Sequence, residues 1–147
     1  MPARFVVQND ERQLTPVKAI AASPDVQLSG TVLLVEDNIM IALEAEDVLL
    51  ALGAEDVLVA SNVGEALRHL TITTPSFALL DINLGSEVSW PIALRLRELN
   101  VRYAFATGYG DTINVPIEHR EALIVAKPYT QDSLSRVIHV REAIAHG

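Results

Sequence analysis

Polar residues of complementary chemistry follow several short apolar runs of this chain. The runs stop at Glu36-Asp37, Asp81, Thr107 and Lys127. We interpret these runs as buried strands of one sheet, and the carboxyl ends of parallel strands meet at the edge where α/β proteins bind ligands. The sequence therefore predicts a site that combines carboxylates, a hydroxyl and an ammonium.

Three acids brought together would repel one another, which predicts a cation between them. Mg²⁺ is the natural candidate, because it prefers oxygen ligands and binds one or two carboxylates together with water and phosphate. Lys127 is the only lysine after residue 30, and a compact ammonium can pair with a carboxylate or with a phosphoryl oxygen. This set suits phosphoryl transfer onto Asp81, with Thr107 and Lys127 holding the phosphoryl oxygens. Taken singly, the acids could equally be helix caps or solvated strand ends.

Strands and helices that would position these residues alternate from Thr31 onward. Apolar runs predict strands at 31–35, 56–60, 76–80, 103–106 and 122–126. Helix starts are predicted at Asn38, at Ser61 or Asn62, at Pro91 and at Thr130. Residues 107–121 leave room for only a short or irregular helix. This order predicts an α/β domain in which helices cover both faces of a parallel five-stranded sheet.

Composition limits the class of protein. The chain has 147 residues, is 50% hydrophobic and has no cysteine, which fits one cytoplasmic domain with its own core. A net charge of -8 argues against a nucleic-acid surface. No apolar run is long enough to cross a membrane. Residues 1–30 are predicted to be an arm or linker, either disordered or docked on the domain or a partner, and residues 31–147 the domain.

Four motifs resemble the receiver domain of bacterial two-component response regulators: VEDN at 35–38, LLDINL at 79–84, Thr107, and AKPY at 126–129. The resemblance implies a doubly wound, flavodoxin-like sheet with strand order 2-1-3-4-5. It also implies that Asp81 is the phosphoacceptor and that Lys127 and Thr107 contact the phosphoryl group. Mg²⁺ would be held by Glu36, Asp37, Asp81 and the backbone carbonyl of Asn83. The Lys127-Pro128 peptide bond would be cis.

The segment FATGY at 105–109 looks like the signature of the FAT GUY receivers, which are short response regulators or receivers attached to sensor kinases in alphaproteobacteria. Typical receivers carry an aromatic switch residue three positions before the lysine, where this chain has Ile124. We therefore expect Thr107 and Tyr109 to form the switch. Tyr109 could instead shield the site from water.

The function expected from these features is that of a phosphoacceptor, not a turnover enzyme. A sensor histidine kinase or a histidine phosphotransfer protein would supply the phosphoryl group, and the chain would act as a phosphate sink or relay, as a monomer or weak homodimer. We expect no DNA-binding module, so any output would need a partner protein. A receiver-like protein-binding module is the alternative. A phosphatase of the haloacid dehalogenase type is disfavoured because Asn83 stands where its second acid is required.

Overall fold

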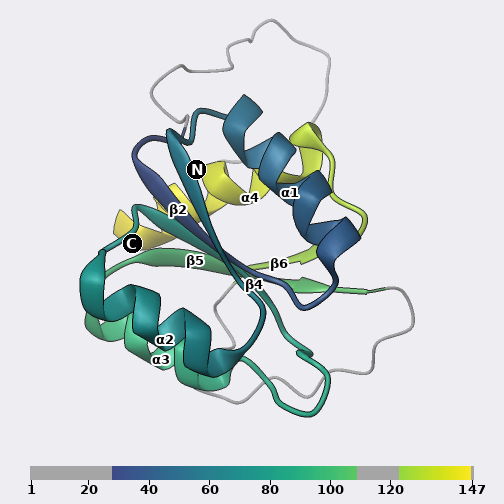
Figure 1. The fold of residues 1–147 in the computed structure, drawn as a ribbon. Coiled ribbons are helices and arrows are strands. Elements are labelled where there is room, and N and C mark those ends of the chain that lie inside the picture. Colours follow the sequence, from purple (N-terminus) through teal and green to yellow (C-terminus); the bar gives the residue numbers. More distant parts are fainter. Residues whose placement is uncertain (1–27, 109–122, 147) are drawn as a thin grey trace, which may run out of the picture.

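The computed structural model describes residues 28–108 and 123–146, the last eight of these by their backbone alone (Figure 1). Within them, five strands form one parallel sheet, in the order β3-β2-β4-β5-β6. The strands are β2 (Thr31–Val35), β3 (Asp56–Ala60), β4 (Phe77–Asp81), β5 (Arg102–Thr107) and β6 (Leu123–Ala126). In chain order this is 2-1-3-4-5, so the predicted flavodoxin-like fold is confirmed.

Helices cover both faces of the sheet, as predicted. They are α1 (Ile39–Ala51), α2 (Val63–Ile72), α3 (Trp90–Glu98) and α4 (Gln131–His146). Figure 1 shows α1 and α4 on one face and α2 and α3 on the other. Alternate residues of β2 follow this division, because Val32 and Leu34 join the apolar cluster under α1 and α4, whereas Leu33 and Val35 join the cluster on the opposite face. Burial on both faces explains why the strands are continuous apolar runs.

Three predicted caps are present. The Asn38 side chain accepts hydrogen bonds from the N–H groups of Met40 and Ile41, at 3.0 and 3.2 Å. Asn62, rather than Ser61, caps α2. Thr130 Oγ1 accepts from the N–H of Ser133 at 3.0 Å, which caps α4. Because Asn38 begins α1 directly after the acidic pair, the cap fixes the path of the chain that leaves β2.

Two strands run one residue beyond their predicted ends. Asp81 and Thr107 are the last residues of β4 and β5, where they lie opposite Ala106 and Ala126 in the parallel ladder. The polarity of these side chains suggested that the strands had ended, whereas the backbone hydrogen bonds continue through them. Most of the segment for which an irregular helix was predicted, including Tyr109, lies outside the described residues.

The chain that enters β2 packs against the turn after α1. Leu28 is buried, and its N–H donates to the carbonyl of Leu52 at 3.0 Å. Gly53 permits this approach: its φ is +118°, and a Cβ there would lie 2.3 Å from the carbonyl oxygen of Leu28. Residues 28–30 thus contact the domain, while the rest of the predicted arm lies outside the described residues.

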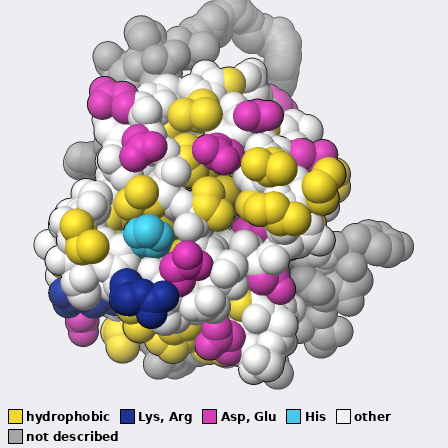
Figure 2. Space-filling model, in the orientation of Figure 1, with side chains coloured by type: hydrophobic (Ala, Val, Ile, Leu, Met, Phe, Trp, Pro, Cys, Tyr) yellow, Lys and Arg dark blue, Asp and Glu magenta, His cyan; other side chains and the backbone are white. Residues whose placement is uncertain are grey.

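One surface of the fold is apolar and acidic. Ile39, Met40 and Leu43 are half or more exposed on the first turns of α1, and Leu50 is exposed near its end. Figure 2 shows hydrophobic side chains over α1 with acidic side chains between them. No helix in the described part of the chain is long and apolar enough to cross a membrane.

Candidate functional site

The strand ends bring most of the predicted site residues together. Glu36 and Asp37 follow β2, Asp81 ends the neighbouring β4, and Lys127 follows β6. Carboxylate oxygens of the three acids lie within 4.8 Å of one another. Thr107 ends β5, between the strands that carry Asp81 and Lys127. The convergence follows from the parallel sheet, which places the carboxyl ends of all these strands at one edge.

Lys127 joins two of the three acids. Its Nζ lies 3.1 Å from Oε1 of Glu36 and 3.0 Å from Oδ2 of Asp81. Both carboxylates are shielded from solvent, with side-chain exposures of 0% for Glu36 and 4% for Asp81. In such a setting each anion needs a hydrogen-bonding cation, because an unpaired buried charge is strongly destabilising. One ammonium therefore serves two carboxylates.

Glu36 is fixed through both of its oxygens. Oε2 accepts a hydrogen bond from the backbone N–H of Asn38 at 3.0 Å, while Oε1 faces Lys127. Burial of the carboxylate raises the pKa of Glu36 to about 7, and the charge of Asp81 raises it further, against the hydrogen bonds from Asn38 and Lys127. Glu36 therefore has a pKa near neutral pH.

One carboxylate oxygen of Asp81 is held by Lys127, and the other has no partner among the described residues. Burial raises the pKa of this carboxyl, opposed chiefly by the hydrogen bond from Lys127. Lys127 holds Oδ2, but the buried Oδ1 has no hydrogen-bond partner among the described residues. Since buried polar atoms are nearly always satisfied, such an atom indicates a place for a ligand or an incoming group.

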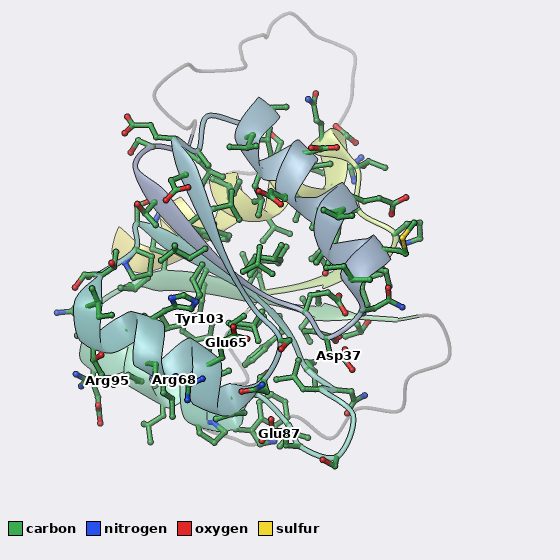
Figure 3. The ribbon with its side chains drawn as sticks, viewed as in Figure 1. Asp37, Glu65, Arg68, Glu87, Arg95 and Tyr103 are labelled. Carbon is green, nitrogen blue, oxygen red and sulfur yellow. The ribbon has the colours of Figure 1, made fainter. Side chains whose placement is uncertain are left out.

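Asp37 and the loop between β4 and α3 form the open side of the site. Asp37 is exposed, and a Cβ added to Gly85 would lie 3.8 Å from its Oδ2, so the loop passes close to this carboxylate. Asn83, whose side chain is exposed, forms an antiparallel bridge with Val88 in the same loop. Figure 3 shows Asp37 and Glu87 at the same end of the molecule.

Glu87 anchors this loop, and sequence reasoning gave it no role. Its carbonyl accepts from the N–H of Leu84 at 2.9 Å, and its side-chain Oε2 accepts from the N–H of Val63 at 3.0 Å. Val63 is the first residue of α2, whose N-terminal N–H groups attract a carboxylate. Glu87 thus connects the loop that carries Asn83 to the N-terminus of α2. No sequence spacing could have indicated this contact, because the two residues are brought together only by the fold.

The backbone connects Lys127 to β5. The N–H of Lys127 donates to the carbonyl of Thr107 at 2.8 Å, one step beyond the last residue of β6. The Lys127-Pro128 peptide bond is cis. Thr107 is partly buried at the end of its strand, and Ile124 is 44% exposed on β6. The proposed partner of Thr107 in the switch, Tyr109, lies outside the described residues.

No protein-family model matches the chain, and no curated protein does. Among solved structures, the BeF3-activated conformation of SdrG from Pseudomonas melonis Fr1 is 31% identical with a TM-score of 0.62, and the match covers 74% of this chain and 92% of that one. The signal receiver domain of a modulated diguanylate cyclase from Desulfovibrio desulfuricans G20 is 28% identical with a TM-score of 0.63, over 79% of this chain and 95% of that one.

A CheY-like response regulator receiver domain from Methylobacillus flagellatus has the same fold, with a TM-score of 0.62 at 21% identity over 76% of this chain and 98% of that one. The chain belongs to the response regulator receiver domains. One edge of its sheet carries the acids after β2, the aspartate that ends β4 and the lysine after β6.

The buried Glu36 makes the stability of this receiver domain depend on pH. Because its pKa rises from 4.5 to about 7 on folding, the folded state binds more protons than the unfolded state between these values. The free energy of unfolding should therefore fall by roughly 3 kcal/mol as pH rises through this window. Urea denaturation at several pH values, without divalent cations, measures this slope. Glu36→Gln should flatten it, and an unchanged slope in that variant would contradict the assignment.

Proposed function

We propose that this receiver domain accepts a phosphoryl group on Asp81 from a phosphohistidine of a sensor histidine kinase or a histidine phosphotransfer protein. The observation that carries the proposal is the state of Asp81: Lys127 holds Oδ2, while the buried Oδ1 has no partner among the described residues. A carboxylate held in this way is oriented as a nucleophile, and the adjacent ammonium can stabilise charge on the transferred group.

The three acids fit Mg²⁺. The donors are all oxygens within 4.8 Å of one another, and they combine buried and exposed carboxylates with an unpartnered oxygen of Asp81. Glu36, Asp37 and Asp81, with the backbone carbonyl of Asn83, would hold the ion. When bound, Mg²⁺ supplies positive charge that offsets the negative charge of the transferring phosphoryl group.

The chain's own residues account for the rest of the transfer. A carboxylate oxygen of Asp81 forms a bond to phosphorus while the bond from phosphorus to the histidine nitrogen breaks, and the electron pair of that bond returns to the imidazole. The product is an acyl phosphate on Asp81. Lys127 donates to the phosphoryl oxygens, and the Thr107 hydroxyl, supplied by the neighbouring strand, is a second donor.

The partner that fits the site is a protein surface that presents a phosphohistidine. Ile39, Met40 and Leu43 form an exposed apolar patch on the first turns of α1, directly after the acidic pair and its cap at Asn38. A protein that docks on this patch brings its histidine to the edge where Asp81 lies. We propose that the chain acts as a phosphate sink or relay for such a donor, with binding to an output protein as the alternative role.

Asn83 disfavours a role as a phosphatase for external esters. An aspartyl phosphatase needs a general acid two residues after its nucleophile, and an amide cannot donate and recover a proton as a carboxyl group does. We therefore propose a protein that is phosphorylated and dephosphorylated itself, without turnover of an external substrate.

The first prediction of this proposal is the loss of labelling in Asp81→Asn. With acetyl phosphate and Mg²⁺, the wild type should gain a phosphate that is stable to acid and labile to base, and the variant should gain none, because an amide oxygen is not a carboxylate nucleophile. Intact-protein mass spectrometry measures the gain. Asp56→Asn is the matched control, since Asp56 begins β3 at the opposite edge of the sheet. The control should be labelled like the wild type, and labelling retained in Asp81→Asn would exclude Asp81 as the acceptor.

A second prediction concerns the metal. Asp37→Ala removes a proposed exposed ligand, so Mg²⁺ affinity should fall by about tenfold or more, because even the loss of a group that only orients a ligand typically costs that much. Without Mg²⁺, the same variant should be more stable than the wild type by about 1 kcal/mol or less, because repulsion from Asp81 is relieved but Asp37 is exposed. Isothermal titration and urea denaturation measure the two effects. Equal Mg²⁺ affinity in both proteins would count against the site.

A third prediction separates the partner from the chemistry. Met40→Glu places a charge in the apolar patch, so transfer from a phosphorylated histidine kinase should slow by about tenfold, which corresponds to roughly 1.4 kcal/mol at an interface. Labelling by acetyl phosphate should stay at the wild-type rate. Ile72→Glu is the matched control, because Ile72 is equally apolar and 84% exposed but ends α2 at the far edge of the sheet. Equal transfer rates for both variants would rule out docking on α1.

A further inference from the structure

The loop between β4 and α3 folds back on itself as a short hairpin. Two hydrogen bonds join its sides: the N–H of Leu84 donates to the carbonyl of Glu87 at 2.9 Å, and the N–H of Ser89 donates to the carbonyl of Ile82 at 3.1 Å. Asn83 lies between these two bonds, in the antiparallel bridge described above. At such a position the bridge uses neither the N–H nor the carbonyl of the residue. The carbonyl of Asn83, a proposed Mg²⁺ ligand, therefore takes no part in the hydrogen bonds of the hairpin.

The Glu87 side chain connects this hairpin to the helix that follows a more distant strand. Its Oε2 accepts a hydrogen bond at 3.0 Å from the N–H of Val63, the first residue of α2. That helix follows β3, the hairpin follows β4, and β2 lies between these two strands in the sheet. Because neighbouring strands are about 4.8 Å apart, the contact joins segments that follow strands about 10 Å apart. It therefore bridges the carboxyl end of β2, which Glu36 and Asp37 follow.

Stabilisation of α2 alone does not explain the Glu87 contact, because this helix has caps of its own. The Asn62 side chain accepts from the N–H of Glu65 at 2.8 Å, and the Glu65 carboxylate accepts from the N–H of Ser61 at 2.8 Å. The hairpin, by contrast, has two hydrogen bonds between its sides and an exposed tip, and an isolated hairpin is only marginally stable in water. Glu87 therefore contributes more to the position of the hairpin than to the helix.

The tip of the hairpin lies against Asp37. Gly85 has a φ of +81° there, and a Cβ at this position would lie 3.8 Å from Oδ2 of Asp37. The hairpin thus lies between a proposed metal ligand and the start of α2. A shift of the hairpin away from α2 would move the Asn83 carbonyl relative to Asp37. Mg²⁺ would be sensitive to such a shift, because it demands near-ideal octahedral geometry.

We propose that Glu87 is a positioning residue of the metal site. By accepting from the first N–H of α2, its carboxylate holds the hairpin where the Asn83 carbonyl and Asp37 bind one Mg²⁺ ion. This inference rests on the proposed function, in which both groups are metal ligands. Because linkage is reciprocal, Mg²⁺ bound by the hairpin also strengthens the contact between Glu87 and α2. Glu87 acts through the hairpin and does not touch the ion or the reacting atoms.

Glu87→Ala tests the proposal, because it removes the contact from the side of the hairpin. Mg²⁺ affinity, followed by amide NMR shifts during titration, should fall by about tenfold, the lower end of the loss that is typical when a group that orients a ligand is removed. Glu55→Ala is the matched control, since it removes an exposed carboxylate just before β3, at the opposite edge of the sheet. Its Mg²⁺ affinity should equal that of the wild type.

Glu87→Gln separates the hydrogen bond from the charge. The amide oxygen of glutamine accepts the same hydrogen bond, so this variant should bind Mg²⁺ like the wild type. A Glu87→Gln variant as weak as Glu87→Ala would overturn the proposal, because the charge of Glu87, and not its contact with α2, would then favour the ion.

Val63→Pro removes the same hydrogen bond from the side of the helix. Proline has no N–H and is well tolerated at the first helical position, and the preceding Asn62 already has the extended backbone that proline favours, with φ -155° and ψ 171°. This variant should lose as much Mg²⁺ affinity as Glu87→Ala, and the double variant should lose no more than either. Additive losses would overturn the proposal.

The reciprocal effect is measured by hydrogen exchange. Saturating Mg²⁺ should slow the exchange of the Val63 amide more in the wild type than in Glu87→Ala, because the contact is present only in the former. Equal slowing in both proteins would contradict the coupling.

The failure of this inference differs from the failure of the proposed function. A wild type that binds no Mg²⁺ overturns the proposed metal site, and the role of Glu87 with it. A wild type that binds Mg²⁺, together with Glu87→Ala and Val63→Pro variants that bind it equally well, overturns the role of Glu87 alone.

Discussion

The shared ion pair of Lys127 is the interaction on which the site depends. Two carboxylates with almost no exposure face one ammonium, and either acid without it would be a buried charge with too few donors. Such a pair adds little net stability, since removal of its charges from water offsets most of the attraction. This ion pair requires three strands to end at the same edge of the sheet. Glu36 follows β2, Asp81 ends β4 and Lys127 follows β6. The strand order of the sheet therefore also determines which charged side chains meet.

Burial gives two adjacent acids different properties. Glu36 lies inside, fixed by Lys127 and by the N–H of Asn38, whereas Asp37 is exposed beside the loop at Gly85. Asn38 contributes twice, because its side chain caps α1 while its N–H holds Glu36. The cap that starts the helix therefore also sets which carboxylate faces the lysine. Two consecutive residues therefore differ in environment: Glu36 is buried with a pKa of about 7, and Asp37 is exposed at the open side of the site.

The sequence was enough to predict the sheet, its helices and the meeting of the acids with Lys127. These features depend on local signals: apolar runs of strand length, a cap residue before three of the helices, a proline in the first turn of α3, and polar residues where the runs stop. Contacts such as that between Glu87 and Val63 could not be predicted, because they join residues 24 positions apart with no periodic signal. The ends of β4 and β5 were each placed one residue early, since a polar side chain does not stop a backbone ladder.

Hydrogen bonds to the backbone hold the two segments that flank the site, which are the loop after β4 and the end of β6. On one side, the loop after β4 is closed by Leu84 and tied to α2 through Glu87. On the other, the N–H of Lys127 is held by the carbonyl of Thr107. The ammonium at the end of the lysine side chain can still choose among acceptors, because it carries three donors on a flexible stem. The proposed phosphoryl group on Asp81 would offer this ammonium further acceptor oxygens at the same edge of the sheet.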